Sequence, residues 1–445
     1  MKAHYSISAF LLCMAVSTAS VGATRTVCGY VNFWDKRSNC SGCGTSCEPG
    51  RIDPCTPDTK KSARGLVVEL WDYDSDGGDE YIGAWKWDNG YRCMTFEWEN
   101  AAYSKGETNP DIYMKISGWK LRTGTAEYVY LRNPDWTTPA DMTWRTTNRV
   151  NECTGGAPCV FPSEHIIGTN SRSDSWTILM NMGNSIENPY LVFANYLVKE
   201  LRVRWAPHCI DCGDPSQGPD DCACGSATAG FADRDQIRVV DSSVWPWYVA
   251  AHEFGHVTQL ALLGRTSLRC DYGPDGDHSL TGVNPDSAAT AEGWAHYVAC
   301  RGYWDPENSS SVPYIFGFDF ESATPVNHDP GDTCADNRGV ELQIGKSFWD
   351  LDDAASETYV APAQTGDGIN ASTSDIAECW YEFADGTSNR QDFECDGDCD
   401  TSDGSWDPQH GVNAWDYYYN CSHIFAASFY SSFLWHNCQQ TMDSN

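Results

Sequence analysis

The stretch from Ala250 to Gln259 contains the residues whose types and spacing could do chemistry. His252 and His256 are four residues apart, and Glu253 directly follows the first of them. On a helix this spacing places both imidazoles on one face, one turn apart, where both can reach a single ion. Zinc is the ion that such a pair suits. The pattern predicts zinc on His252 and His256, with Glu253 as the general base that takes a proton from the activated water.

The residues around this motif predict the helix that the spacing requires. The chain holds 11 histidines, so an accidental copy of the motif is the alternative, and such a copy need not be helical. Here Pro246 suits a first helical turn, residues 248–263 contain no helix breaker except Gly255, and Gly264 marks the end. We therefore interpret the motif as a real metal site on a helix.

A catalytic zinc ion needs a third protein ligand, which must come from another part of the chain. Histidines are absent three and six positions beyond His256, where Gln259 and Leu262 stand, and this excludes the metzincin pattern. A second helix is predicted over residues 284–300, with Asn284 as its N-cap and Glu292 in its middle. Small side chains that would let two helices approach closely surround Glu292: Ala288, Ala289, Ala291, Ala295 and Ala299.

Glu292 is our preferred third ligand, although other assignments remain open. His278, Asp271 and His296 are the competing ligands, and Glu292 could instead be a surface glutamate on an alanine-rich core helix. His296, one turn after Glu292, fits better as a hydrogen-bond partner of a ligand or as a packed histidine.

These residues resemble the gluzincin branch of zinc metallopeptidases, the thermolysin-like side of the zincins. The resemblance rests on HEFGH and on Glu292 in AEGWAHY, 36 positions beyond His256, and it covers roughly residues 236–304. It implies zinc on His252, His256 and Glu292, and a catalytic Glu253. Several gluzincins carry an aspartate where this chain has His296. When hydroxide attacks an amide carbonyl, the oxyanion that forms needs a hydrogen-bond donor. The candidates are Tyr297, Tyr303, Tyr314, His278 and His296.

The N-terminus and the cysteines predict a secreted protein. Residues 1–23 have the charge, the apolar run and the small-residue end of a signal peptide. Without Cys13, the 21 cysteines leave an even 20, which favours a disulfide framework over thiolate zinc sites at Cys40/Cys43 and Cys209–Cys224. The net charge of −33 excludes nucleic acid and anionic membranes as default partners, and no later apolar run has the length of a membrane span.

The mature chain is predicted to be multidomain. Residues 24–139 should form an all-β sandwich, because short β-rich runs alternate with turns there. Three of its motifs, Gly29 to Asp35, Val68 to Asp72 and Asp111 to Ile116, resemble transthyretin-like extracellular modules. Residues 140–162 form a cysteine-containing linker that holds Cys153 and Cys159, and residues 163–445 form an α+β, mainly helical, zincin-like catalytic domain. Strands are predicted at residues 27–33, 64–72, 81–87, 93–98, 111–116 and 127–131.

Four further segments carry expectations that a structure can test. Residues 189–205 should form a long core helix, and residues 236–240 a strand that either holds an extended peptide substrate or is a plain sheet strand. Residues 345–353 should form a helix whose Asp350, Asp352 and Asp353 make a solvated acidic face without a metal role, and residues 365–409 are a polar, acidic stretch.

Acidic loops raise the question of calcium. The aspartates at 72, 74, 76 and 79 could gather Ca²⁺, but Gly83 stands where an EF-hand has its final glutamate, and we favour a solvated acidic turn. The same holds for the aspartates at 396, 398 and 400.

The sequence therefore predicts a secreted zinc endopeptidase that acts on a protein or peptide substrate. Two alternatives stay open, namely an extracellular binding or structural protein with a vestigial zinc site, and a zinc hydrolase of non-peptide substrates. Nothing in the sequence indicates the oligomeric state.

Overall fold

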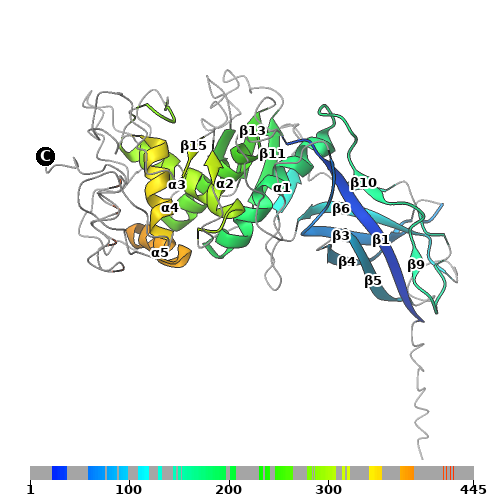
Figure 1. Ribbon diagram of the computed structural model, residues 1–445. Helices are drawn as coiled ribbons and strands as arrows, with labels where there is room; N and C mark the ends of the chain where they lie inside the picture. Colours follow the sequence, from blue (N-terminus) through cyan, green and yellow to red (C-terminus); the bar gives the residue numbers. More distant parts are fainter. Residues whose placement is uncertain are drawn as a thin grey trace, which may run out of the picture.

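The structure is a computed structural model in which helices gather in one part of the molecule and most strands in the other (Figure 1). With short gaps inside them, the described ranges are 23–37, 59–98, 109–119, 129–132, 144–196, 201–206, 230–240, 246–263, 278–306, 313–320, 340–352 and 371–384, together with Ala414, Tyr417, Cys421 and Ile424. Residues 1–22 of the predicted signal peptide and the cysteines at 40, 43 and 209–224 lie outside these residues, whereas Ala23, the last residue of that predicted peptide, is the first of β1.

The first sheet is built around the long strand β1 (Ala23–Asp35). The N-terminal half of β1 pairs antiparallel with β5 (Tyr91–Trp98) and parallel with β9 (Cys159–Val160). Its C-terminal half pairs with β2 (Thr59–Ser62) and β10 (His165–Ile167). A disulfide joins Cys28 of β1 to Cys93 of β5. Strand β1 is thus the axis of this sheet.

The second sheet has eight strands among the described residues. Its order is β12 (Gly230–Asp233), β13 (Gln236–Val240), β11 (Leu201–Ala206), β7 (Val129–Arg132), β6 (Ile112–Trp119), β3 (Leu66–Asp72) and β4 (Glu80–Trp87), with β8 (Trp144–Arg145) also on β6. Both sheets contribute to one buried core, in which Gly29 of β1 lies against the Met114 side chain of β6. The sequence-predicted strand runs 27–33 through 127–131 all contain strands in the structure.

The strand pairings cross the predicted domain boundaries. Strand β7, from the predicted sandwich, pairs in parallel with β11, from the predicted catalytic domain. Strand β9 belongs to the predicted linker, which is closed by the Cys153–Cys159 disulfide, yet it pairs with β1. The predicted sandwich, linker and catalytic domain therefore share sheets. The boundaries at 139 and 162 and the transthyretin-like class remain predictions.

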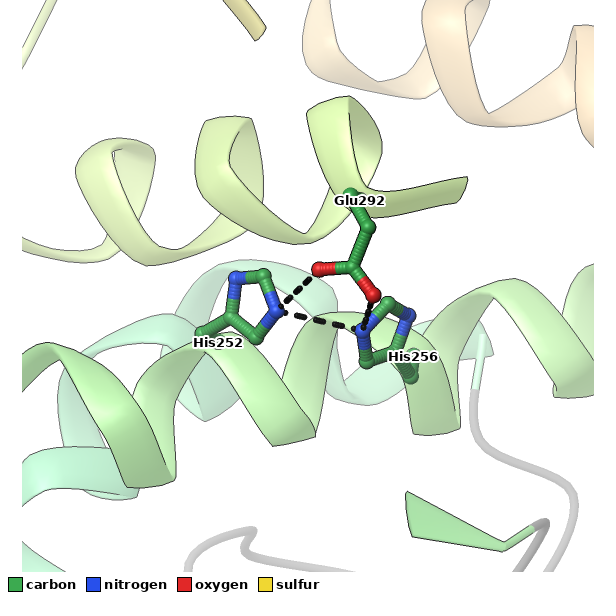
Figure 2. Close-up of side chains that lie close together, drawn as sticks. All are labelled: His252, His256 and Glu292. Atoms are coloured by element: carbon green, nitrogen blue, oxygen red, sulfur yellow. Dashed lines mark hydrogen bonds and ion pairs between the residues drawn. The ribbon is translucent and has the colours of Figure 1, made fainter. Parts of the chain in front are cut away.

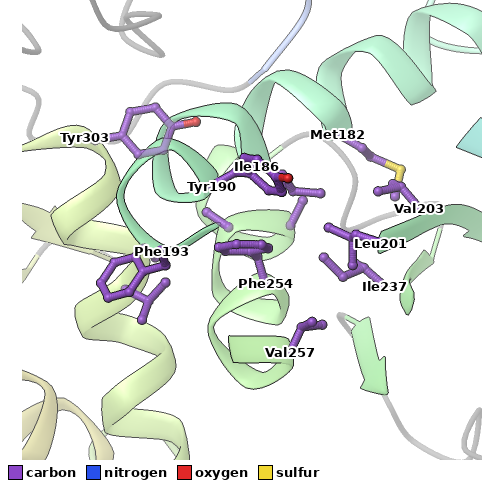
Figure 3. Packing of buried hydrophobic residues seen from close by; sticks show 14 of the residues in the cluster. Met182, Ile186, Tyr190, Phe193, Leu201, Val203, Ile237, Phe254, Val257 and Tyr303 are labelled. Carbon is purple, nitrogen blue, oxygen red and sulfur yellow. The ribbon is translucent and has the colours of Figure 1, made fainter. Parts of the chain in front are cut away.

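The helices are α1 (Ser175–Phe193), α2 (Trp247–Leu263), α3 (Asp286–Tyr303), α4 (Glu341–Asp352) and α5 (Thr373–Ala384), with a short 3₁₀ turn at Ala194–Tyr196 after α1 and a small hairpin of β14 (Tyr314–Ile315) and β15 (Phe318–Asp319). Side chains of α1, α2, β11 and β13 meet in one part of the core (Figure 3). The rings of Tyr190 and Phe254 are 6.0 Å apart there. None of the helices in the described part of the chain combines the length and apolar character needed to cross a bilayer.

The prediction of one helix over residues 189–205 is wrong. The helix begins at Ser175, where the Asp174 carboxylate accepts a hydrogen bond from the Thr177 N–H at 2.8 Å, and it ends at Phe193. Residues 201–206 instead form strand β11, in which Leu201 and Val203 are buried. Apolar residues on both sides of the junction happen to continue a helical period, and tertiary pairing with β7 and β13 selected the strand. Strand β13 has β11 on one side and β12 on the other, so it is a plain sheet strand whose edges are already occupied.

The end of β1 joins the first sheet to the helices. Asn181 of α1 accepts a hydrogen bond from the Lys36 N–H at 2.8 Å and donates one to the Trp34 carbonyl at 2.9 Å. The buried Arg37 guanidinium pairs with Asp35 and reaches the Tyr303 hydroxyl of α3 at 3.2 Å. An N-terminal strand is therefore part of the packing that orients α1 and α3.

Candidate metal centre

Helices α2 and α3 cross at an unusually close contact, which brings the predicted ligands together. A Cβ placed on Gly255 of α2 would lie 2.5 Å from the Cα of Ala295 of α3. The Trp294 indole N–H donates to the Gly255 carbonyl at 3.2 Å and to the Thr258 hydroxyl at the same distance. Small residues at the crossing let the short side chain of a glutamate on α3 reach α2, as the alanine-rich sequence around Glu292 suggested.

His252, His256 and Glu292 converge within the crossing, with the carboxylate directed at both imidazoles (Figure 2). Glu292 Oε2 lies 2.7 Å from His252 Nε2, Glu292 Oε1 lies 3.4 Å from His256 Nε2, and the two Nε2 atoms are 3.2 Å apart. Zinc–ligand bonds of ~2.0–2.1 Å in a tetrahedral site put ligand atoms about 3.3 Å apart. Two imidazole nitrogens and a carboxylate are donors that zinc accepts, and the separations of 3.2 and 3.4 Å match zinc ligands, whereas the 2.7 Å contact between Glu292 Oε2 and His252 is a hydrogen-bond distance.

The charges of these three groups depend on one another because all are buried. Burial, together with the nearby His296 and His256, lowers the pKa of His252 to about 4. Burial acts in the same direction on His256, but the negative charge of Glu292 outweighs it and raises the pKa of His256 above its ordinary value. Burial would raise the pKa of Glu292, yet the two imidazoles hold it well below its usual range. A negative carboxylate beside a neutral His252 is the charge state in which both can bind a cation.

Glu253 lies on α2 directly after His252 and is 6% exposed. Burial and the charge of Glu292 raise the pKa of its carboxyl group to about 7, against the opposite effects of His256 and His278. A carboxylate with a pKa close to neutrality can both accept and return a proton there. The position and environment of Glu253 therefore suit a general base.

His296 and His278 both lie beside the three predicted ligands. His296 Nδ1 is 3.1 Å from His252 Nδ1, and the two rings are 4.5 Å apart. His278 Nε2 is 3.5 Å from Glu292 Oε1, and its Nδ1 is 2.7 Å from Glu341 Oε1. The second set that could hold a metal, His278 with Glu292 and Glu341, shares only Glu292 with the first. Neither histidine is thus grouped with His252 and His256 as a ligand.

Glu341 is the residue of this site that the sequence did not reveal. It lies in the first turn of α4, is 2% exposed, and its pKa is held below the usual value by its histidine neighbours despite burial. An acidic residue in a first helical turn is the only sequence signal it carries, and many such residues cap helices without any other role.

Tyr297 and Tyr303 are directed away from the three ligands. The Tyr297 hydroxyl donates to Asp352 Oδ2 at 2.8 Å, and Tyr297 stands five residues after Glu292, on another face of α3. The Tyr303 hydroxyl bonds to the Ser185 carbonyl at 3.0 Å. Of the predicted oxyanion donors, the structure brings His278 and His296 to the site, and it places these two tyrosine hydroxyls in the helix packing.

The prediction of a solvated acidic face at Asp350, Asp352 and Asp353 is wrong for the first two residues. Asp350 and Asp352 are 5% and 4% exposed. Asp352 pairs with Arg301 of α3 at 2.7 Å and accepts hydrogen bonds from Tyr297 and from Thr373 of α5. The stretch predicted as polar at 365–409 contains α5, whose Trp380 is fully buried, so this face of α4 is covered by α5.

The acidic loop after β3 is held by protein groups. Asp79 accepts hydrogen bonds from the Tyr113 hydroxyl at 2.7 Å and from the Asp74 N–H at 3.2 Å, and it pairs with Arg145 at 3.0 Å. Asp72 accepts from the Asp111 N–H at 2.6 Å. Within the described residues, these aspartates are not among the groups spaced to hold a metal. The aspartates at 76, 396, 398 and 400, and Asp271, lie outside the described residues, so calcium stays untested there.

Comparison with known proteins adds no assignment, because no family model, no curated protein and no solved structure matches this chain.

Proposed function

We propose that this protein is a zinc-dependent endopeptidase that is secreted and hydrolyses peptide bonds in a protein or peptide substrate. The single observation that carries the proposal is the convergence of His252 Nε2, His256 Nε2 and the Glu292 carboxylate, with contacts of 2.7 to 3.4 Å among them and with Glu253 buried next to them. Two histidines and one carboxylate form the ligand set of a hydrolytic zinc site that keeps a position for water.

His252, His256 and Glu292 would hold the ion. When bound, zinc lowers the pKa of water to about 7 and polarises a carbonyl oxygen. The Glu253 carboxylate accepts a proton from the attacking water and carries it to the leaving amine nitrogen, and its pKa of about 7 lets it do both near neutral pH. His278 is hydrogen-bonded through Nδ1 to Glu341, and its Nε2 lies 3.5 Å from Glu292 Oε1, so a developing oxyanion would share the Nε2–H with that carboxylate. Burial lowers its pKa, but Glu341 and Glu292 outweigh burial and raise it to about 9.

The test is a comparison of the full chain with Glu253→Gln, which removes the base and keeps the shape. We expect wild type to bind one zinc ion and to cleave a casein-type substrate, and Glu253→Gln to bind zinc equally while losing activity by a factor of at least about 100, as for other acid–base groups. Glu378→Gln, on the exposed surface of α5, is the matched control and should keep full activity.

Three results would contradict the proposal in different ways. If the folded wild-type protein does not bind zinc, the alternative of an extracellular binding or structural protein is favoured. A zinc-loaded protein on which Glu253→Gln has no effect would remove Glu253 from the reaction, and zinc binding without cleavage of any peptide would favour a non-peptide substrate.

A further inference from the structure

Glu341 is a buried carboxylate that faces two histidines at once. Its Oε1 lies 2.7 Å from His278 Nδ1, which is a hydrogen bond, and its Oε2 lies 3.7 Å from His296 Nε2, which is the distance of an ion pair. With 2% exposure, Glu341 exerts its charge in a poorly solvated environment, where a carboxylate acts strongly on neighbouring protons.

Each of these histidines in turn contacts one of the three converging ligands. His296 Nδ1 is 3.1 Å from His252 Nδ1, and His278 Nε2 is 3.5 Å from Glu292 Oε1. Two chains of contacts therefore start from Glu341: one passes through His296 to His252, and the other through His278 to Glu292. Both ligands are thereby linked to α4, although His252 lies on α2 and Glu292 lies on α3.

The proton positions along the first chain follow from the ligand geometry. His252 directs Nε2 towards Glu292 and His256, so a metal bound there leaves the proton on its Nδ1. That N–H must donate to His296 Nδ1, which then carries its own proton on Nε2, facing Glu341. A carboxylate 3.7 Å away in a buried site favours this tautomer of His296, because it stabilises a proton on the nearer nitrogen.

We propose that Glu341 is a positioning residue of the metal centre, which acts through His296 on His252 and through His278 on Glu292. This inference rests on the proposed zinc site. It assigns to α4, a third helix, the task of fixing the tautomer and orientation of two ligands that α2 and α3 supply.

The alternative is that His278, Glu292 and Glu341 bind a second ion, since their ligand atoms also lie within 4.8 Å of one another. The two carboxylates, however, face opposite nitrogens of the His278 ring, at 2.7 Å and 3.5 Å. An imidazole that bridges two carboxylates through both nitrogens is a hydrogen-bonding link, whereas a shared ion would need one nitrogen and both carboxylates directed at the same point.

The experiment measures zinc affinity by competition with a chelator, using the full chain. Glu341→Gln should bind zinc about 10–100-fold more weakly than wild type, which is the usual loss when an outer partner of a ligand histidine is removed. Asp352→Asn is the control, because Asp352 is another buried carboxylate of α4, and its partners Arg301 and Tyr297 form a separate cluster. It should be less stable and keep the wild-type affinity for zinc.

A pair of variants at His296 tests the chain itself. His296→Gln keeps one acceptor for His252 and one donor for Glu341, and should retain more zinc affinity than His296→Leu, which keeps neither. The losses in His296→Leu and Glu341→Gln should be less than additive when combined, because both break the same chain. If Glu341→Gln does not fold, the two His296 variants decide by themselves.

Three results would overturn the proposal. Equal zinc affinity in wild type and Glu341→Gln, or in His296→Gln and His296→Leu, would show that the contacts do not act on the ligands while leaving the zinc site intact. Two zinc ions in wild type and one in Glu341→Gln would make Glu341 a ligand. Wild type without zinc affinity would remove this inference and the proposed function together.

Discussion

Replacing Gly255 by alanine should separate α2 from α3 and thereby disturb the proposed metal centre. The added Cβ would lie 2.5 Å from the Cα of Ala295 and 3.0 Å from its Cβ and carbonyl oxygen. Carbon atoms in contact are normally ~3.5–4.0 Å apart, so the helices must separate by about 1 Å. Since two of these atoms belong to the backbone of α3, no side-chain rotation can relieve the clash.

The expected magnitude is a balance of two effects. Overpacking a core costs about 1–3 kcal/mol, and a clash with backbone belongs at the upper end. Alanine in place of a glycine inside a helix stabilises the helix by about 1 kcal/mol. The free energy of unfolding should therefore fall by about 2 kcal/mol, which lowers the melting temperature by roughly 4–8 °C in a domain of this size. Glu292 is three residues before Ala295 on α3, and a displacement of about 1 Å there should reduce the hydrolytic rate about 100-fold.

The assay combines thermal unfolding, followed by circular dichroism, with zinc affinity and peptide hydrolysis. Gly302→Ala provides a matched clash at the far end of α3, where a Cβ would lie 2.6 Å from Pro189 of α1. It should lower stability similarly and leave zinc affinity close to wild type. If Gly255→Ala is as stable as wild type, or if both variants bind zinc equally well, the close crossing does not position Glu292 and the reasoning fails.

Two further predictions concern buried ionisable groups outside the proposed metal centre. Asp352→Ala leaves the Arg301 guanidinium without its 2.7 Å partner and the Tyr297 hydroxyl without its acceptor, so chemical denaturation should show a loss of about 3–5 kcal/mol, and a loss below 1 kcal/mol would contradict a structural role for this cluster. His165, buried and within 2.9 Å of the Thr146 hydroxyl, has its pKa lowered by burial from 6.5 to about 4. Between these two pH values the unfolded chain binds more protons than the folded one, so stability is complete above pH 6.5 and falls as the pH drops towards 4, by up to about 3 kcal/mol. Unfolding of His165→Gln across the same range should lack this component, and an unchanged pH dependence would show that His165 is not its source.

The sequence alone determined the local parts of the candidate site. The run up to Leu263, in which Gly255 is the one helix breaker, and the N-cap at Asn284 predicted helices that the structure has at Trp247–Leu263 and Asp286–Tyr303. These signals are sufficient because capping and side-chain periodicity act within one or two turns of chain. The six strand runs of the N-terminal part were predictable for the same reason, since alternation is a property of neighbouring residues.

Only the tertiary structure decided how these parts meet. The direction of the Glu292 carboxylate depends on a crossing of two helices, and Glu341 became visible because α4 packs where Gly293 of α3 leaves room for Ile344 and Gly345. Asp352 was mistaken for a solvated residue because the Arg301 that neutralises it is 51 positions away in the chain. Strand β11 continued a helical pattern and was nevertheless selected as a strand by its neighbours β7 and β13. Contacts between distant segments have free energies that no local pattern contains, and at this site they decide which carboxylates face the histidines.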